Sequence, residues 1–204
     1  MEMPTFERRV SKQTIGCPKP FNACADPIVC NGMGLYLHVV EAMVTEAYWW
    51  CGECSNAERL TLEIACHVIS GRTLDSVRQL NVEAFAAAGG DVVNDLQIIS
   101  VRVLLAVEMA LVDHEVKRVL AAAVGQDMEA HHKLKQLGFV ARDGQQRLKK
   151  LLEGELTRLK LQVPTVKAQE WTAYGTLEDC SRWVQSAVKT ELLREVMERC
   201  YPSP

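Results

Sequence analysis

The feature that most constrains the fold is an apolar segment from Leu96 to Val112, whose 17 residues include only two charged ones, Arg102 and Glu108. This segment is too short and too charged to cross a membrane, which takes about 20 mostly apolar residues. Its apolar side chains would point in every direction around a helix, a pattern typical of a helix that other elements surround. The segment therefore predicts a buried central helix at about residues 92–112.

The patterns on either side of this segment predict further helices. Ser55 followed by Glu58 forms a capping box, which indicates that a helix begins there, and Gly71 is a fitting residue just past its end. No Asn-Gly or Asp-Gly pair, the signal of a β-hairpin, lies between two runs of alternating apolar and polar residues. Apolar residues also recur at the three-to-four spacing of a helix face between about residues 34 and 50, at Leu35, Val39 and Met43.

These patterns predict an all-α fold, a single-domain bundle of about eight helices around the central apolar helix, covering residues 32–204. Residues 1–31 hold four of the seven prolines and no sustained period, so we expect an irregular N-terminal arm there. A chain of 204 residues that is 48% hydrophobic and 24% charged can bury such a core without disulfides.

The N-terminus lacks the apolar stretch of a secretory signal. We therefore expect an intracellular protein, cytoplasmic or nuclear, with no transmembrane segment and with reduced cysteines. The alternative is a secreted chain whose signal has been removed, in which the eight cysteines could pair. The formal net charge of -3 argues against a protein dedicated to coating nucleic acid.

Cysteines offer the first candidate site. Cys51 and Cys54 form a CxxC pair, which is half of a tetrahedral zinc site. The other half would come from two of Cys17, Cys24, Cys30 and His38, and structural zinc would then anchor the N-terminal arm. Two alternatives are a redox CxxC pair, for which the sequence does not predict the usual strand-to-helix setting, and thiols that serve only as small hydrophobic side chains.

A carboxylate-bridged di-metal enzyme is the second metal hypothesis. Glu129 and His132 form a Glu-x-x-His motif of the kind that such helical bundles use. However, Glu63 and His67 have a different spacing, and on a helical wheel they share the polar stripe of their helix. The remaining acidic residues that this hypothesis would use are Glu41, Glu46 and Glu108. Because the chain also has no nucleotide-binding or hydrolase motif, the sequence favours a protein that is not an enzyme.

The leading functional prediction is a non-enzymatic, intracellular helical module for protein–protein interaction. Such an adaptor or regulator would present a groove between amphipathic helices to another protein. Trp49 and Trp50 are the first candidate partner-binding residues, because two adjacent tryptophans in a helix cannot both face inward; packing against the N-terminal arm is the alternative. Lys149 and Lys150 are the next candidates.

A basic segment supports a third prediction. Residues 131–160 hold eight Lys or Arg residues against three acidic ones, a local charge of 8 − 3 = +5. A basic helical face of this kind could bind nucleic acid or anionic lipid. The alternative is a solvated surface with no ligand.

Overall fold

The structure is a computed structural model that describes residues 7–11, 17–89, 97–124 and 177–202. The chain separates into two compact units, one formed by residues 1–111 and 192–204 and the other by residues 112–191. No helix among these described residues has the length and apolar character needed to span a membrane.

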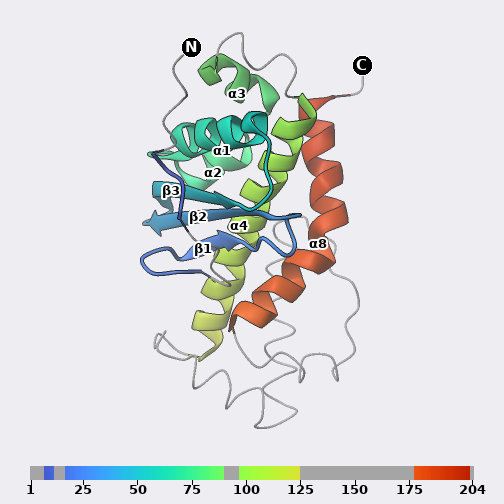
Figure 1. The fold of residues 1–204 in the computed structure, drawn as a ribbon. Coiled ribbons are helices and arrows are strands. Elements are labelled where there is room, and N and C mark those ends of the chain that lie inside the picture. Colours follow the sequence, from blue (N-terminus) through green and yellow to red (C-terminus); the bar gives the residue numbers. More distant parts are fainter. Residues whose placement is uncertain (1–6, 12–16, 90–96, 125–176, 203–204) are drawn as a thin grey trace. The chain divides into compact units, whose positions relative to one another are not determined.

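An antiparallel three-stranded sheet is the centre of the first unit. Its strands are β1 (Ala23–Ala25), β2 (Met33–Val40) and β3 (Met43–Cys51), in the order β1-β2-β3 (Figure 1). The prediction of an all-α helical bundle is therefore wrong, because residues 34–50 form a β-hairpin and not a helix. The first strand also lies within the range predicted to be an irregular arm.

Two physical reasons explain why the sequence patterns did not predict the hairpin. Its turn is formed by Glu41 and Ala42 at φ 49° and 62°, the left-handed pair of a type I′ turn that usually selects Asn-Gly or Asp-Gly. A bond from Leu74 N to Ala42 O, 2.9 Å long, holds this turn in place. In addition, the β2 side chains are buried on both faces of the sheet over most of the strand, so hydrophobic and polar residues do not alternate.

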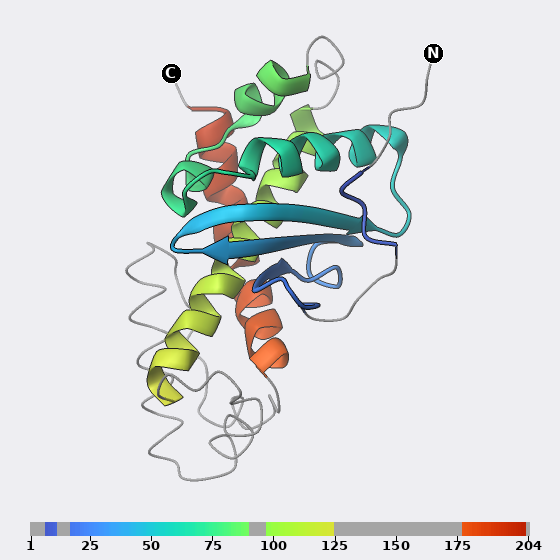
Figure 2. The ribbon, with the colours of Figure 1, turned by 90° about the vertical axis from the view of Figure 1, so that its left-hand side faces the viewer.

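α1 (Asn56–Ile69) packs against β3 of the sheet (Figure 2). The predicted capping box is confirmed: Ser55 is the N-cap, its side chain accepts from Glu58 N, and the Glu58 carboxylate accepts from Ser55 N. Gly71 follows the helix at φ 79°, the left-handed conformation that glycine adopts without strain.

Two short helices and two long ones complete the described fold. The short ones are α2 (Leu74–Arg78) and α3 (Val82–Gly89), and the long ones are α4 (Gln97–Val124) and α8 (Leu177–Cys200). Both long helices contribute residues to both units. The apolar segment forms the first part of α4, so its predicted helical conformation is confirmed over its described residues, although it is not the centre of an all-α bundle. Ile98 is exposed, and these side chains are buried: Val101, Val103, Leu104, Leu105, Ala106, Val107, Met109, Ala110, Leu111 and Val112.

Candidate functional site

Cys30, Cys51 and Cys54 lie near one end of the sheet, where β2 begins and β3 ends. Met33, the first residue of β2, pairs with Cys51, the last residue of β3. Met33 N donates to Cys30 O at 3.2 Å, and Gly52 N donates to Gly32 O at 3.3 Å. Paired antiparallel Cα atoms lie about 5 Å apart and the ends of a turn less than about 7 Å apart. These values place the Cα atoms of Cys30 and Cys51 roughly 12 Å apart at most.

The loop that carries Cys30 is built by Asp26. Ile28 N donates to Asp26 Oδ1 at 2.8 Å, and Cys30 N donates to Asp26 O at 2.9 Å. Asn31 and Gly32 then adopt φ values of 53° and 83°, which suit an Asn-Gly pair. This loop buries the Cys30 side chain, which is 5% exposed.

Cys51 and Cys54 form a disulfide with a Cα–Cα distance of 5.9 Å. Cys51 is 2% exposed, whereas Cys54 is half-buried. The pair lies between the end of β3 and Ser55, the N-cap of α1, so it does have a strand-to-helix setting, contrary to the sequence analysis. A helix N-terminus stabilises a nearby thiolate and so lowers thiol pKa values in general.

A second disulfide joins Cys17 to Cys24 of β1, with a Cα–Cα distance of 5.6 Å. Four of the five cysteines predicted as zinc ligands are therefore paired, and Cys30 lies outside both disulfides. A metal needs thiolate sulfur, so these pairs must be reduced before they can act as ligands. In the oxidised structure Cys30, Cys51 and Cys54 are not grouped within metal-binding reach of one another.

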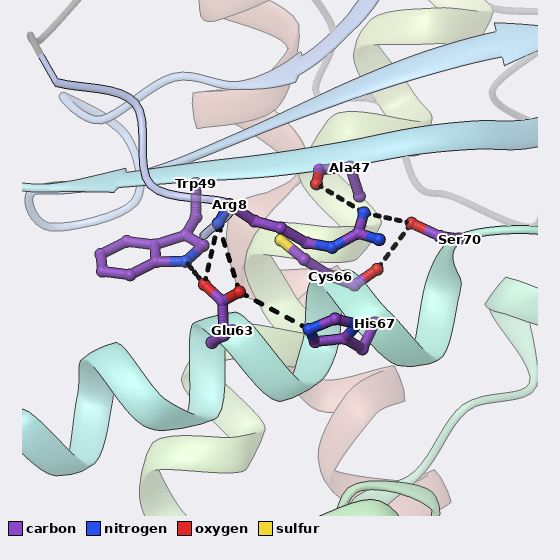
Figure 3. A network of polar contacts seen from close by, with 7 residues as sticks. All are labelled: Arg8, Ala47, Trp49, Glu63, Cys66, His67 and Ser70. Carbon is purple, nitrogen blue, oxygen red and sulfur yellow. Dashed lines mark hydrogen bonds and ion pairs between the residues drawn. The ribbon is translucent and has the colours of Figure 1, made fainter. Parts of the chain in front are cut away.

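A buried carboxylate forms the second polar cluster of the first unit (Figure 3). Glu63 of α1 is 7% exposed, and its Oε2 accepts from Trp49 Nε1 at 2.7 Å. The backbone N–H of Arg8 donates to both carboxylate oxygens, at 3.2 and 3.3 Å. The polar stripe predicted for this helix is therefore not uniformly solvated: Glu63 is covered, while His67, with Nε2 at 3.6 Å from Glu63 Oε1, is largely exposed.

Cys66 lies on the same helix, one residue before His67, and is fully buried. Burial raises the pKa of the Cys66 thiol well above its ordinary value, and the nearby charge of Glu63 raises it further. The thiol is therefore protonated and poorly reactive at neutral pH. Cys66 is a core side chain in this structure.

The two tryptophans predicted to bind a partner lie on opposite faces of β3. Trp49 is fully buried on the side of α1, and Trp50, which pairs with Gly34, is half-buried. Adjacent strand residues alternate between faces, which explains how both pack. Lys149, Lys150 and the basic segment 131–160 lie outside the described residues.

The residues of the di-metal hypothesis that the structure describes are not grouped as ligands. Glu41 is in the hairpin turn, Glu46 pairs with His38 across the sheet, and Glu108 of α4 forms an ion pair with Arg199 at 2.8 Å. Burial raises the pKa of Glu108, and the Arg199 charge opposes this increase. Glu129 and His132 lie outside the described residues.

Sequence reasoning missed the Arg8 contact to Glu63, and it named Cys30 as a possible partner of the CxxC pair without distinguishing it from Cys17 and Cys24. The Asn31-Gly32 pair is the one local signal that could have indicated a turn before β2.

Comparisons of the chain with protein-family models, with curated proteins and with solved structures find no match.

Proposed function

We propose that this protein binds a soft metal ion through Cys30, Cys51 and Cys54 when these cysteines are reduced. The Cys51–Cys54 disulfide is then the oxidised, metal-free state of the same site. The observation that carries the proposal is the strand register, which brings Cys30 beside a CxxC turn that is 21 residues further along the chain. Thiolate sulfur is the ligand that zinc and other soft metals prefer.

The surroundings of Cys54 favour a thiolate. Cys54 directly precedes the N-terminus of α1, where the helix dipole stabilises negative charge. Cys30 and Cys51 are buried, so a bound ion would be shielded from bulk water. Both the Cys30 loop and the Gly52-Glu53 turn lie outside the strands, so they can move together once the disulfide opens.

A dithiol supplies two electrons and two protons, which convert the Cys51–Cys54 disulfide to two thiols while the dithiol becomes a disulfide. Metal binding then releases thiol protons. Three protein thiolates leave one position of a tetrahedral ion for a fourth ligand, as in zinc sites that remain open to exchange.

The test is zinc binding by the full chain, reduced and oxidised, measured as metal per chain after gel filtration. We expect about one zinc ion per reduced chain, none per oxidised chain, and loss of zinc in Cys30→Ser. Cys17→Ser is the matched control, because it alters the other disulfide and should retain zinc. Full zinc binding by Cys30→Ser, or its loss in Cys17→Ser, would refute the ligand set.

A folding defect in Cys30→Ser would complicate that result, so X-ray absorption of the reduced wild-type protein provides an independent measurement. We expect about three sulfur ligands at about 2.3 Å from zinc. A first shell of nitrogen and oxygen only would overturn the proposal.

A thiol–disulfide redox function is the second candidate. The strand-to-helix setting of the CxxC pair and the greater exposure of Cys54 favour it, because an attacking thiol must be accessible. Reduction of a disulfide substrate by the metal-free protein, with loss of turnover in Cys54→Ser, would identify this function. The predicted helical interaction groove and the intracellular location remain predictions.

A further inference from the structure

The N-terminal segment Arg8–Val10 lies against the outer edge of β3. Arg9 forms a parallel bridge with Trp49. Val10 N donates to Trp49 O at 2.7 Å, and Trp49 N donates to Arg8 O at 2.9 Å. Strand addition to a sheet edge through such main-chain bonds is a recurrent way of binding a peptide.

The same segment is also recognised through a side chain (Figure 3). Arg8 Nη1 donates to Ser70 Oγ at 2.9 Å and to Ala47 O at 3.3 Å. Ser70 Oγ in turn donates to Cys66 O at 2.7 Å, which fixes its orientation. These acceptors come from α1 and its C-cap on one side and from β3 on the other, so they form a small receptor for a guanidinium group.

The receptor is chemically specific. Glu63 accepts the Arg8 backbone N–H, and the Arg9 guanidinium lies 5.9 Å from the centre of the Trp49 ring, within the range of a cation–π contact. A segment that fits must therefore be extended and must run parallel to β3. The residue whose backbone N–H donates to Glu63 must be an arginine.

The rest of the β3 edge is already occupied. Val44 N donates to Arg72 O at 2.9 Å and Gly71 N donates to Val44 O at 2.7 Å, while Met43 bridges to Thr73. Beside Trp49, the described residues that pair with this edge are those of the Arg8–Val10 segment. A strand that competes with Arg8–Val10 would thus pair with a short stretch of the β3 edge beside Trp49.

We propose that the groove between β3 and α1 binds an extended, arginine-bearing segment of another protein, and that Arg8–Val10 is the competitor that occupies it in the same chain. The Arg8–Val10 contacts supply the chemistry of the partner: a sequence of the Arg-Arg-aliphatic type. Binding in trans is weakened by the fraction of molecules in which the internal segment is docked.

The test uses a fluorescent peptide with the sequence of residues 6–12 and the full-length protein, with fluorescence anisotropy as the readout. Val10→Pro in the protein removes the N–H that bonds to Trp49 O, so it should undock the internal segment. We expect the peptide to bind Val10→Pro at least about tenfold more tightly than wild type, because the internal competitor is weakened. Arg8→Ala is a second variant that weakens the same competitor by a different contact.

The matched control is a peptide with alanine in place of the first arginine. We expect it to bind about tenfold more weakly, because it lacks the charged donor to Ser70 Oγ and Ala47 O. Circular dichroism checks that each variant is folded. Equal binding of the two peptides, or no increase in affinity in either variant, would overturn the proposal.

Discussion

Replacing Trp49 with phenylalanine tests whether the buried Glu63 carboxylate depends on the indole N–H. The indole donates to Glu63 Oε2 at 2.7 Å, and the Arg8 backbone N–H donates to the two oxygens of the same carboxylate at 3.2 and 3.3 Å. A hydrogen bond to a buried charged group contributes about 1.5–3 kcal/mol. The smaller ring removes roughly another 1 kcal/mol of packing, so we expect Trp49→Phe to lower the free energy of unfolding by about 2–4 kcal/mol.

The measurement is urea unfolding followed by far-ultraviolet circular dichroism, which does not depend on tryptophan emission. Trp50→Phe is the matched control, because Trp50 is half-buried and lies on the other face of β3. We expect the control to lose less than about 1.5 kcal/mol. Similar losses in the two variants would contradict the role given to the indole N–H.

A double-mutant cycle with Glu63→Leu isolates the interaction. Removing one partner leaves the other buried and unsatisfied, whereas replacing both by apolar groups avoids that penalty. The double variant should therefore be more stable than the sum of the single losses predicts, by about 1.5–3 kcal/mol. Additivity within about 0.5 kcal/mol would show that the two side chains are not coupled.

Three further predictions concern buried ionisable groups. Arg199→Leu removes the charge that opposes the raised pKa of Glu108. A carboxyl pKa that is raised in the folded state lowers stability as the pH increases through it, so the variant should lose more melting temperature relative to wild type at pH 8 than at pH 5. A loss that does not depend on pH would contradict this. Cys66 should resist iodoacetamide in the folded protein while reduced Cys54 reacts, as mass spectrometry can show; equal labelling would contradict the burial of Cys66. In the second unit, Lys117→Met should lower stability by about 3 kcal/mol, because it breaks a buried pair with Asp113. Arg194→Met, at the exposed pair with Glu198, should lose less than about 1 kcal/mol in the same urea assay.

Local rules predicted the features that depend on a few neighbouring residues. The Ser55–Glu58 capping box forms as expected, and Gly71 follows the helix with a positive φ. Each of these depends on hydrogen bonds or steric freedom within one turn of chain. The apolar segment likewise forms a buried helix, because its composition leaves no polar face.

The hairpin could not be predicted in this way, because its turn depends on distant residues. Glu41 and Ala42 have little intrinsic preference for positive φ. Their turn is held by Leu74 N and by the bridge from Met43 to Thr73. A sequence window around residue 41 contains neither of these partners, and the three-to-four spacing of buried residues favoured a helix.

The same dependence on distant contacts limited the prediction of the site. Sequence spacing identified the CxxC pair but treated Cys17, Cys24 and Cys30 as equivalent candidates for the other ligands. The strand register separates them, because it places Cys30 beside Cys51, while Cys17 pairs with Cys24 on the first strand. Register depends on which faces are buried and on the turn, so an error in the hairpin becomes an error in the ligand set.

Glu63 shows why a helical wheel alone misjudged a polar stripe. The wheel correctly places Glu63 with His67 away from the apolar face of α1, and His67 is largely exposed. However, a sheet edge beside the helix has unpaired backbone groups, and the Arg8–Val10 segment that pairs with them also covers Glu63. The carboxylate is thus covered by a backbone N–H that needs an acceptor and by the Trp49 indole, which also donates to it. For a polar residue next to an open strand edge, the amphipathic pattern of its helix therefore predicts exposure to solvent, whereas the fold can place the residue in a binding groove.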